Sequence, residues 1–324
     1  MSKIKVRNLR DDLSFGSIVE GATYETLADP EVRAELNALF EDRGMIVFKG
    51  VESSDEMHLA ISNVFGPLKD HPTKGTARVN DNKAIGVIDM HSKPRDLSNG
   101  DLRGLVEING KVVTRFSPWH FDHCYNDELN RAGVLRCKLN APEGGRTGFA
   151  DGVGIYRDFD PALREKIEGL NVIYTLDTRL TRMRFGRTFK TFGDPDGTSP
   201  TVEEAKIFPR AMHPAVWTRR TGEKVMHIGP WMSVGLEHNE TPEGEALFEE
   251  VCQEANRQAD ANSYWHDWTP TDMVIWDNWR MLHAVEGNDP KYERQTQRTT
   301  IKGDYGLGYF EDGKKIGEVY RELA

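Results

Sequence analysis

Short β-like runs dominate the chain from Trp119 onward, and they restrict the possible fold more than any other feature. These runs are VLRCKLNA at 134–141, LNVIYTLD at 170–177, HPAVWTR at 213–219, KVMHIGP at 224–230, DMVIWDN at 272–278 and RTTIKGD at 298–304. Turn residues separate the runs. Helical patterns interrupt them near 161–169 and 242–258. The series predicts a mainly β fold, either a sandwich or a barrel, with flanking helices.

The beginning of the chain predicts a compact helix–strand–helix unit. Apolar residues recur at helical spacing in DPEVRAELNALFEDR at 29–43, which carries a proline in its first turn and ends before Gly44. MIVFK at 45–49 is rich in β-forming residues and predicts a buried strand. A second helix is expected over 53–64, where Ser-Ser-Asp forms a capping pattern. Residues 66–115 are rich in Gly, Pro, Asn and Asp, which predicts a loop-rich segment.

The length of 324 residues suits one β-barrel enzyme with insertions. No composition shift marks a domain boundary, so residues 1–324 are expected to form a single domain. The segment 178–212 carries many charges and few periodic apolar residues. It is too long for a plain connection and predicts a lid or active-site insert.

Charge and cysteine content exclude several classes of protein. The net charge of −10 and the pI near 5.6 argue against a nucleic-acid partner, which calls for a basic surface. No apolar stretch approaches the roughly 18 to 20 residues of a membrane span, so no membrane partner is expected. Cys124, Cys137 and Cys252 form no CxxC pair, which argues against a disulfide framework or a thiolate zinc site. With no signal-peptide pattern, these features predict a cytoplasmic protein.

The segment WHFDHCY at 119–125 carries a candidate metal site. In a regular strand, residues two apart point to the same side, so His120 and Asp122 could face one ion. Two histidines and one carboxylate suit iron(II) and leave positions open for other ligands. The alternative is a chance tripeptide, with a hydrogen-bonded histidine beside a surface aspartate. In the same strand His123 would point away from Asp122, in a packing role.

The segment WDNWRMLHAVEGNDPKYERQTQRTT at 276–300 offers the missing ligand. His283 lies in an apolar setting, and Arg294 and Arg298 follow it. An arginine pairs with a carboxylate through two parallel hydrogen bonds, as a dicarboxylate cosubstrate would require. A solvated strand edge is the alternative for these arginines. Asp277 and Asn278 are expected to brace the strand that carries His283.

With these motifs in order, the chain resembles the taurine / 2,4-dichlorophenoxyacetate dioxygenase family of iron(II)/2-oxoglutarate enzymes. The resemblance rests on RGMIVFKGV at 43–51, FGPL at 65–68, WHFD at 119–122, APEGGRTGFAD at 141–151, HPAVWTRRTGEKVMHI at 213–228, WDNWRMLHAV at 276–285 and ERQTQRTTIKGD at 293–304. It covers most of the chain. It implies a double-stranded β-helix core, that is, a cupin-like jelly roll, and a homo-oligomeric dioxygenase that uses iron(II), 2-oxoglutarate and dioxygen.

The resemblance also implies roles for single residues. The iron ligands would be His120, Asp122 and His283. Thr147 would hydrogen-bond a carboxylate of 2-oxoglutarate, and Arg294 would pair with its distal carboxylate. The other implied positions are Arg298, which would brace the cosubstrate or grip an acidic group of the substrate, His71, which would face the substrate, and His213, with a structural role.

Two departures from the taurine-type pattern bear on the substrate. Phe116 stands where a polar residue is usual, and HIGPWMSVGLEH at 227–238 replaces an Asn-rich stretch. A pocket with Phe116, Trp231 and Met232 as walls would suit a small organic acid with an aromatic or apolar body. The enzyme is expected to hydroxylate this substrate and to release succinate and carbon dioxide. Two alternatives stay open: a cupin-like metalloenzyme that needs no 2-oxoglutarate, and a catalytically dead binding module on the same barrel.

Overall fold

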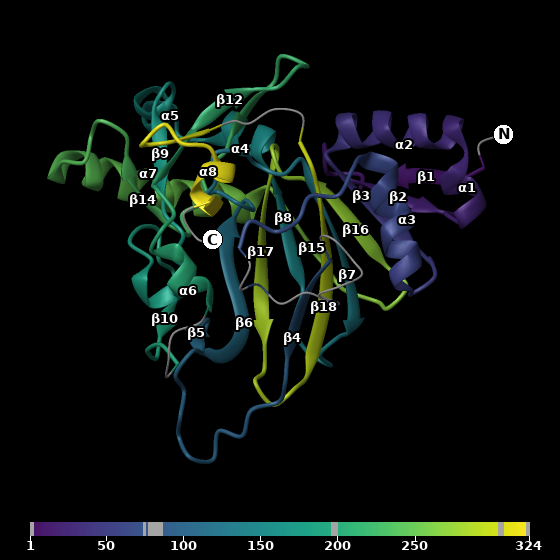
Figure 1. The fold of residues 1–324 in the computed structure, drawn as a ribbon, viewed down its shortest axis with the longest axis horizontal. Helices are drawn as coiled ribbons and strands as arrows, with labels where there is room; N and C mark the ends of the chain where they lie inside the picture. The colour runs from purple at the N-terminus through teal and green to yellow at the C-terminus, as the bar shows by residue number, and fades with distance from the viewer. Residues whose placement is uncertain (1–2, 74–75, 77–86, 196–199, 304–307, 322–324) are drawn as a thin grey trace.

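The fold is built on two large sheets that face each other. The computed structural model describes residues 3–73, 76, 87–195, 200–303 and 308–321. The first sheet is seven-stranded, in the order β1 (Lys5–Asn8), β2 (Ser17–Glu20), β3 (Met45–Lys49), β16 (Met273–Asp277), β7 (Ala132–Leu139), β18 (Arg294–Ile301) and β4 (Val87–Ser92). The second is six-stranded, in the order β10 (Lys190–Thr191), β5 (Val106–Ile108), β6 (Lys111–His120), β17 (Met281–Asn288), β8 (Thr147–Asp151) and β15 (Ser263–His266). Figure 1 shows β6, β17 and β8 beside β18, β7 and β4.

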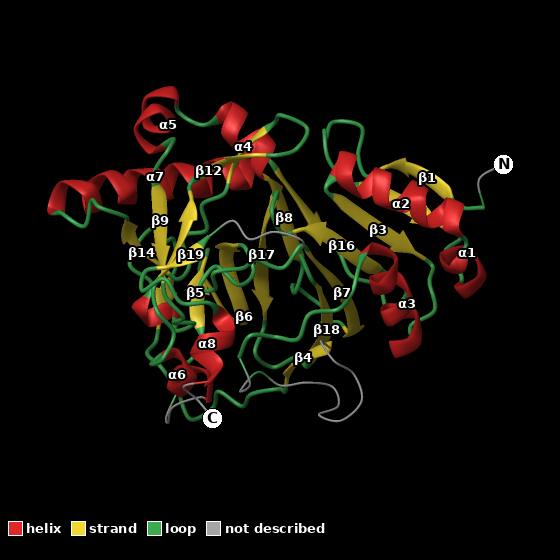
Figure 2. Cartoon of the chain, turned by 45° about the horizontal axis from the view of Figure 1, so that its top comes forward, coloured by secondary structure: helices red, strands yellow, loops and turns green. Residues whose placement is uncertain are grey.

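Smaller sheets and helices surround this pair. A four-stranded sheet has the order β14 (Ser233–Leu236), β9 (Asn171–Tyr174), β11 (Ala211–Pro214) and β19 (Tyr309–Phe310), and β12 (Val216–Thr218) pairs with β13 (Lys224–Met226). The helices are α1 (Tyr24–Ala28), α2 (Pro30–Arg43), α3 (Asp55–Phe65), α4 (Gly152–Asp158), α5 (Pro161–Ile167), the short 3-10 turn Leu180–Arg182, α6 (Pro200–Ala205), α7 (Pro242–Ala261) and α8 (Ile316–Arg321). Helices α1–α3 gather beside β1–β3, whereas α4, α5 and α7 lie on the opposite side (Figure 2).

Three apolar clusters hold these layers together. One lies between the two large sheets, where Phe149 of β8 packs against Trp276 of β16 with ring centroids 5.5 Å apart. A second joins helices α1–α3 to the outer face of the first sheet, with Leu36 and Phe40 among its buried residues. The third packs α7 against the smaller four-stranded sheet. The first of these clusters therefore fills part of the space between the two large sheets.

The mainly β prediction is confirmed, and so are several element boundaries. The strand at 45–49 is β3, residue for residue. The predicted helix at 29–43 is α2, where Asp29 caps the Glu31 N–H at 2.8 Å and Gly44 ends the helix with φ 70°. A positive φ is unstrained for glycine, which explains the sharp end of this helix. The next helix begins at Asp55 rather than at Ser53, because Ser54 is its cap.

The described part of 66–115 is loop-rich, as predicted, but it also includes β4, β5 and the start of β6; 74–75 and 77–86 lie outside the described residues. In β4 the residues that line the cavity are the apolar Ile88 and Met90, whereas Asp89 accepts from Gln295 and His91 contacts Glu293. The run at 213–219 is not one strand. Its first part, β11, pairs with β9, and its second part, β12, pairs with β13.

The expected strand over 298–304 begins earlier, at Arg294, and residue 304 lies outside the described residues. The segment 178–212 contains the 3-10 turn, β10 and α6, and β10 extends the second sheet by pairing with β5. Residues 196–199 of this segment are outside the described residues. In the ranges that the structure describes, no helix has both the length and the hydropathy of a membrane span.

The buried His58 on α3 predicts a loss of stability at acid pH. Burial lowers the pKa of His58 from 6.5 to about 4, and its Nε2 donates to the Val134 carbonyl at 2.9 Å. Between these pH values the unfolded chain binds the proton more readily, so the free energy of unfolding falls as the pH drops. We expect His58 alone to remove about 2 kcal/mol between pH 8 and pH 5, as measured by urea unfolding.

The control for this prediction is His58→Gln. Glutamine keeps a donor for the Val134 carbonyl but does not titrate, so the pH dependence of unfolding should shrink by the amount given. A His58→Gln protein that loses as much stability as the wild type between pH 8 and pH 5 would contradict the prediction.

Candidate functional site

The antiparallel pairing of β6 with β17 places two histidines opposite each other. His120 is the last residue of β6, and its register partner is His283 of β17. Directly opposed residues of an antiparallel pair project to the same face of the sheet. The two rings accordingly lie with their centroids 4.0 Å apart. Gly229 makes room behind this pair, since a Cβ there would approach the His120 Cα to 2.9 Å.

Asp122 reaches the same place from a turn. The prediction of a regular strand through WHFDHCY is wrong, because β6 ends at His120 and residues 122–125 form a turn. One ligand atom each of His120, Asp122 and His283 lies within 4.8 Å of the others, and this is the one such group among the described residues. All three side chains are buried.

Asn278 holds the turn in place. Its Oδ1 accepts the backbone N–H of Asp122 at 2.8 Å, and its Nδ2 donates to the Asp122 carbonyl at 3.0 Å. The same Nδ2 lies 3.1 Å from Asn130 Oδ1, and the Asn278 carbonyl accepts from His227 Nε2 at 2.9 Å. The expected bracing role of Asn278 is therefore directed at Asp122, across the site from β17.

The electrostatics favour a metal-binding protonation state. His120 Nδ1 donates to the Pro118 carbonyl at 2.8 Å, which leaves the Nε2 lone pair for a ligand bond. Burial lowers the pKa of both His120 and His283, so both rings are neutral near pH 7. Burial alone would raise the pKa of Asp122, but the positive charge of Arg298 brings it below the ordinary value. The set is thus two neutral imidazoles and one carboxylate.

These residues fit an iron(II) ion. Two imidazole nitrogens and one carboxylate oxygen on one side are the donor set of mononuclear iron oxygenases. Asp122 Oδ2 is buried and has no hydrogen-bond partner, so a ligand bond would satisfy it. Asp122 Oδ1 already accepts from Arg298 Nη1 at 2.5 Å.

A cavity of about 360 Å³ opens from this group, between the two large sheets. A volume of this size suits a small-molecule site. Its lining contains every predicted site residue: His71, Phe116, His120, Asp122, Thr147, Trp231, Met232, His283, Arg294 and Arg298. The segment 178–212 contributes Thr178 and Thr201 to the lining; its closure as a lid stays a prediction.

One end of the cavity carries Thr147 and Arg294. Arg294 is 5% exposed, and its Nη2 donates to the Gly145 carbonyl at 2.7 Å, while its buried Nε has no partner. Gly145 has φ 80°, and a Cβ there would meet Arg294 Nε at 2.7 Å. This close approach explains the glycine beside the arginine. Thr147 Oγ1 accepts from Trp268 Nε1 at 3.0 Å, which leaves its own hydroxyl proton to donate elsewhere.

Arg298 marks the other half of the cavity. It follows Arg294 by four residues on β18, so the two arginines share a face and lie about 13 Å apart along the strand. Arg298 pairs with Asp122 at 2.5 Å, whereas Arg294 lies on the Thr147 side. The cavity therefore has two cationic positions, one beside the candidate metal group and one beside Thr147.

Aromatic and sulfur-containing side chains wall the remaining space. Trp231 meets the His120 ring edge-on at a centroid distance of 4.9 Å, and Phe116 contacts Phe189 at 4.9 Å. Met232 is buried, with φ 66°. The predicted apolar walls are thus part of the cavity. His71 also faces it, and the backbone N–H of Thr73 donates to His71 Nδ1 at 3.1 Å.

Among the cavity residues that sequence reasoning missed, two carry nitrogen donors: His123 and Arg115. His123 was expected to point away from Asp122, but its φ of 61° turns it into the cavity, where it meets His71 with ring centroids 5.0 Å apart. Arg115, with φ 58°, also lines the cavity. No periodicity could have shown either position, because both depend on left-handed backbone conformations within or beside β6.

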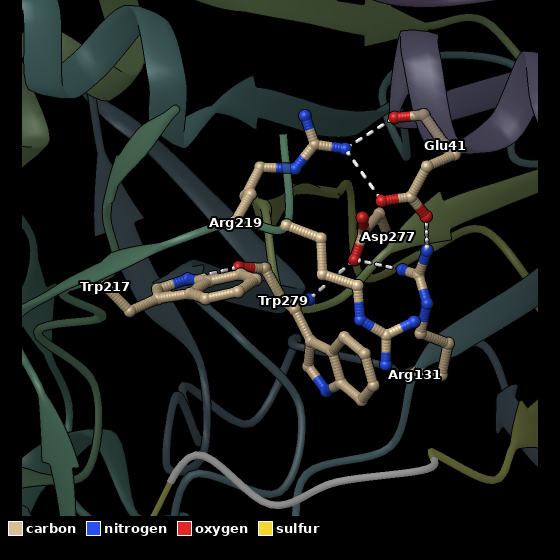
Figure 3. Close-up of a pocket in the computed structure, with 7 residues that line it drawn as sticks. Glu41, Arg131, Trp217, Arg219, Asp277 and Trp279 are labelled. Atoms are coloured by element: carbon tan, nitrogen blue, oxygen red, sulfur yellow. Dashed lines mark hydrogen bonds and ion pairs between the residues drawn. The ribbon is translucent and has the colours of Figure 1, made fainter. Parts of the chain in front are cut away.

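A cluster of charged residues lies at the turn between β16 and β17 (Figure 3). Arg131 pairs with Asp277 at 2.5 Å and with Glu41 at 2.6 Å, and Arg219 also contacts Glu41. Asp277 in turn accepts the backbone N–H of Trp279 at 2.9 Å. The cavity at this cluster is only about 20 Å³, enough for a single water. The expected bracing by Asp277 is thus a fixation of the turn between β16 and β17.

The structural role expected for His213 agrees with its surroundings. This residue is buried, and its Nε2 donates to the Asn126 carbonyl at 2.8 Å. His227 stacks on Phe121 with centroids 3.9 Å apart. Both histidines therefore fix the chain that follows β6, where Asp122 lies.

Comparison with known proteins identifies the family. Residues 5–300 match the family described as taurine catabolism dioxygenase TauD, TfdA family. The alpha-ketoglutarate-dependent 2,4-dichlorophenoxyacetate dioxygenase of Cupriavidus pinatubonensis is 27% identical, over 86% of this chain and 91% of that protein. The (S)-phenoxypropionate/alpha-ketoglutarate-dioxygenase of Sphingobium herbicidovorans is 26% identical, over 90% and 93%.

Solved structures agree on the fold. A putative alpha-ketoglutarate-dependent taurine dioxygenase from Burkholderia xenovorans superposes with a TM-score of 0.66 at 20% identity, over 96% of this chain and 93% of that one. AAD-2 in complex with Mn(II) and N-oxalylglycine gives 0.68 at 21% identity, over 94% and 99%. The jelly-roll prediction is confirmed. The chain belongs to the TauD/TfdA family and is an iron(II)- and 2-oxoglutarate-dependent dioxygenase.

Proposed function

We propose that His120, Asp122 and His283 hold the iron, and that Thr147 and Arg294 hold 2-oxoglutarate. The observation that carries this proposal is one cavity in which a buried His–Asp–His group lies beside a buried arginine. Arg294 offers an unpartnered Nε, and the Thr147 hydroxyl keeps its proton for a carboxylate. Arginine stays charged even when it is buried, so it suits a dicarboxylate.

Iron, 2-oxoglutarate and dioxygen together supply the oxidation of a substrate C–H bond, with release of succinate and carbon dioxide. The residues of the chain orient the proposed ligands and exclude water from part of the cavity. Asn278 and the Pro118 carbonyl orient two of the proposed ligands, and Phe116 and Trp231 keep part of the cavity apolar. Where the hydroxylated carbon carries an ether oxygen, the product collapses and the C–O bond breaks.

We further propose a small organic acid with an apolar body as the substrate. Arg298 and His71 supply polar contacts on the metal side of the cavity, and Phe116, Trp231 and Met232 supply apolar walls. The two relatives described above act on 2,4-dichlorophenoxyacetate and on (S)-phenoxypropionate, which combine an acid with an aromatic ring. Succinate release from 2-oxoglutarate, with iron(II) and ascorbate, tests the reaction. A panel of such acids tests the substrate.

Three broader proposals accompany this function. Residues 1–324 form a single domain, supported by the two large sheets, whose strands come from both ends of the chain. The enzyme is cytoplasmic, supported by Cys124, Cys137 and Cys252, which are buried free thiols. It is a homo-oligomer, as the family resemblance implies; light scattering on the purified protein tests this state.

The cosubstrate site predicts a specific defect in Arg294→Ala. Removing a buried charged partner costs roughly 2–5 kcal/mol, so the affinity for 2-oxoglutarate should fall at least 30-fold. Calorimetry with the Mn(II)-loaded protein measures this affinity. Metal binding should be retained, because Arg294 does not contact the triad.

Arg146→Ala is the matched control for this experiment. Arg146 lies beside Thr147 in sequence but is 45% exposed and pairs with Glu286 at 2.7 Å. Its loss should leave the affinity for 2-oxoglutarate within about twofold. Equal affinities in Arg294→Ala and the wild type would refute the assignment of the cosubstrate end.

The metal site predicts a separate effect of Asn278→Ala. This change removes both hydrogen bonds to the Asp122 backbone and frees the turn that carries the carboxylate. Loss of such an orienting group lowers metal affinity by about 10- to 100-fold. Competition of Mn(II) with a chelator measures this affinity, and Asn171→Ala, at a surface contact with Glu237, is the control.

His120→Ala should abolish succinate release; activity in that variant would disprove the triad.

A further inference from the structure

Several polar atoms of the cavity lining are buried without a hydrogen-bond partner. Those on Asp122 and Arg294 are accounted for by the proposed iron and 2-oxoglutarate sites. His123 is different, since both of its ring nitrogens lack a partner although the residue is only 2% exposed. Burying an imidazole without any hydrogen bond is unfavourable, unless a ligand supplies the missing contact.

The backbone directs this ring into the cavity. His123 has φ 61°, in the left-handed region, and this conformation turns the side chain toward the space beside Asp122. There it stands at 88° to the His71 ring, with centroids 5.0 Å apart. The two rings come from segments far apart in sequence and meet at one edge of the cavity. They therefore form a pair of hydrogen-bonding groups outside the cosubstrate end.

A charged hydrogen-bond donor lies near this ring. Arg298 acts on His123, and although one arm of Arg298 pairs with Asp122, its buried Nε has no hydrogen-bond partner. Lys69, which also acts on His123, is paired with Glu128. An anion at this end could therefore accept from Arg298 as well as from the two rings. This end lies about 13 Å from Arg294, as judged along β18, so one group of 2-oxoglutarate cannot serve both. The anion expected here is the acidic head of the primary substrate.

We propose that His123 is a specificity-determining residue whose ring N–H donates a hydrogen bond to the acid head of the primary substrate, beside His71. The substrate body then extends along Trp231 and Phe116. This inference rests on the proposed function, since it places the acid relative to the iron and 2-oxoglutarate. It adds a contact from the turn that carries Asp122, so substrate recognition and metal ligation share one loop.

The test compares an acid with its uncharged twin. The probes are 2,4-dichlorophenoxyacetate and the corresponding primary amide, titrated by calorimetry into protein loaded with Mn(II) and 2-oxoglutarate without oxygen. The variants are His123→Gly and His123→Asn. Glycine and asparagine both tolerate a positive φ, so neither strains the turn, and asparagine keeps an N–H donor close to the position of Nδ1. His123→Gln does the same for Nε2.

We expect the wild type to bind the acid more tightly than the amide. In His123→Gly the dissociation constant of the acid should rise about 10- to 100-fold, while that of the amide changes less than threefold. At least one of His123→Asn and His123→Gln should recover most of the loss. A wild type that does not prefer the acid, a glycine variant that keeps the preference, or failure of both amide side chains to restore it would each overturn the proposal.

The same titration separates this inference from the proposed function. Binding of 2-oxoglutarate is measured first, before the acid is added. If 2-oxoglutarate does not bind to the Mn(II)-loaded wild type, the proposed cosubstrate site fails. 2-Oxoglutarate could instead bind equally to the wild type and the His123 variants. If the preference for the acid over the amide is then also the same in all of these proteins, only the assignment of His123 fails.

Discussion

The register between β6 and β17 is the constraint on which the site depends. It sets His120 opposite His283, on the face of the second sheet that looks toward the first. Neither histidine could be moved by one residue without turning its ring to the other face. The remaining parts are arranged around this pair. The turn after β6 brings in Asp122, and the facing strand β18 brings in both arginines.

The support of the turn extends well beyond the metal group. Asn278 accepts a hydrogen bond from the backbone of Asp122. On either side of it, Asp277 pairs with Arg131, and the Trp279 carbonyl accepts from Trp217. Arg131 also binds Glu41 on α2 (Figure 3). Helix α2 is therefore connected to the turn between β16 and β17 through a short series of polar contacts, which run from the half-exposed Glu41 through Arg131 to the buried Asp277. This arrangement keeps a carboxylate on a turn as well placed as one on a strand.

Much of this could be predicted from sequence, and the failures have physical causes. The strand at 45–49 and the helix before it were predicted well because apolar periodicity and capping residues coincide there. The ten predicted site residues all line one cavity, because the motifs that carry them follow the pattern of the family to which the chain belongs. Strand β4 was missed since Asp89 and His91 interrupt its apolar residues; these side chains pair with Gln295 and Glu293 and do not line the cavity. The orientation of His123 was missed since a single left-handed residue reverses a side chain without any change in residue pattern.

Strand β18 also limits how such an enzyme can change. Arg294 and Arg298 serve two ends of the cavity from one face of one strand. Substitutions elsewhere on β18 leave that spacing intact, whereas inserting or deleting one residue between them would turn one arginine out of the cavity. The distance between the proposed cosubstrate and substrate ends is thus fixed by the rise per residue of this strand. New substrates are accommodated most easily by exchanging side chains on the walls, and least easily by changing the length of this strand.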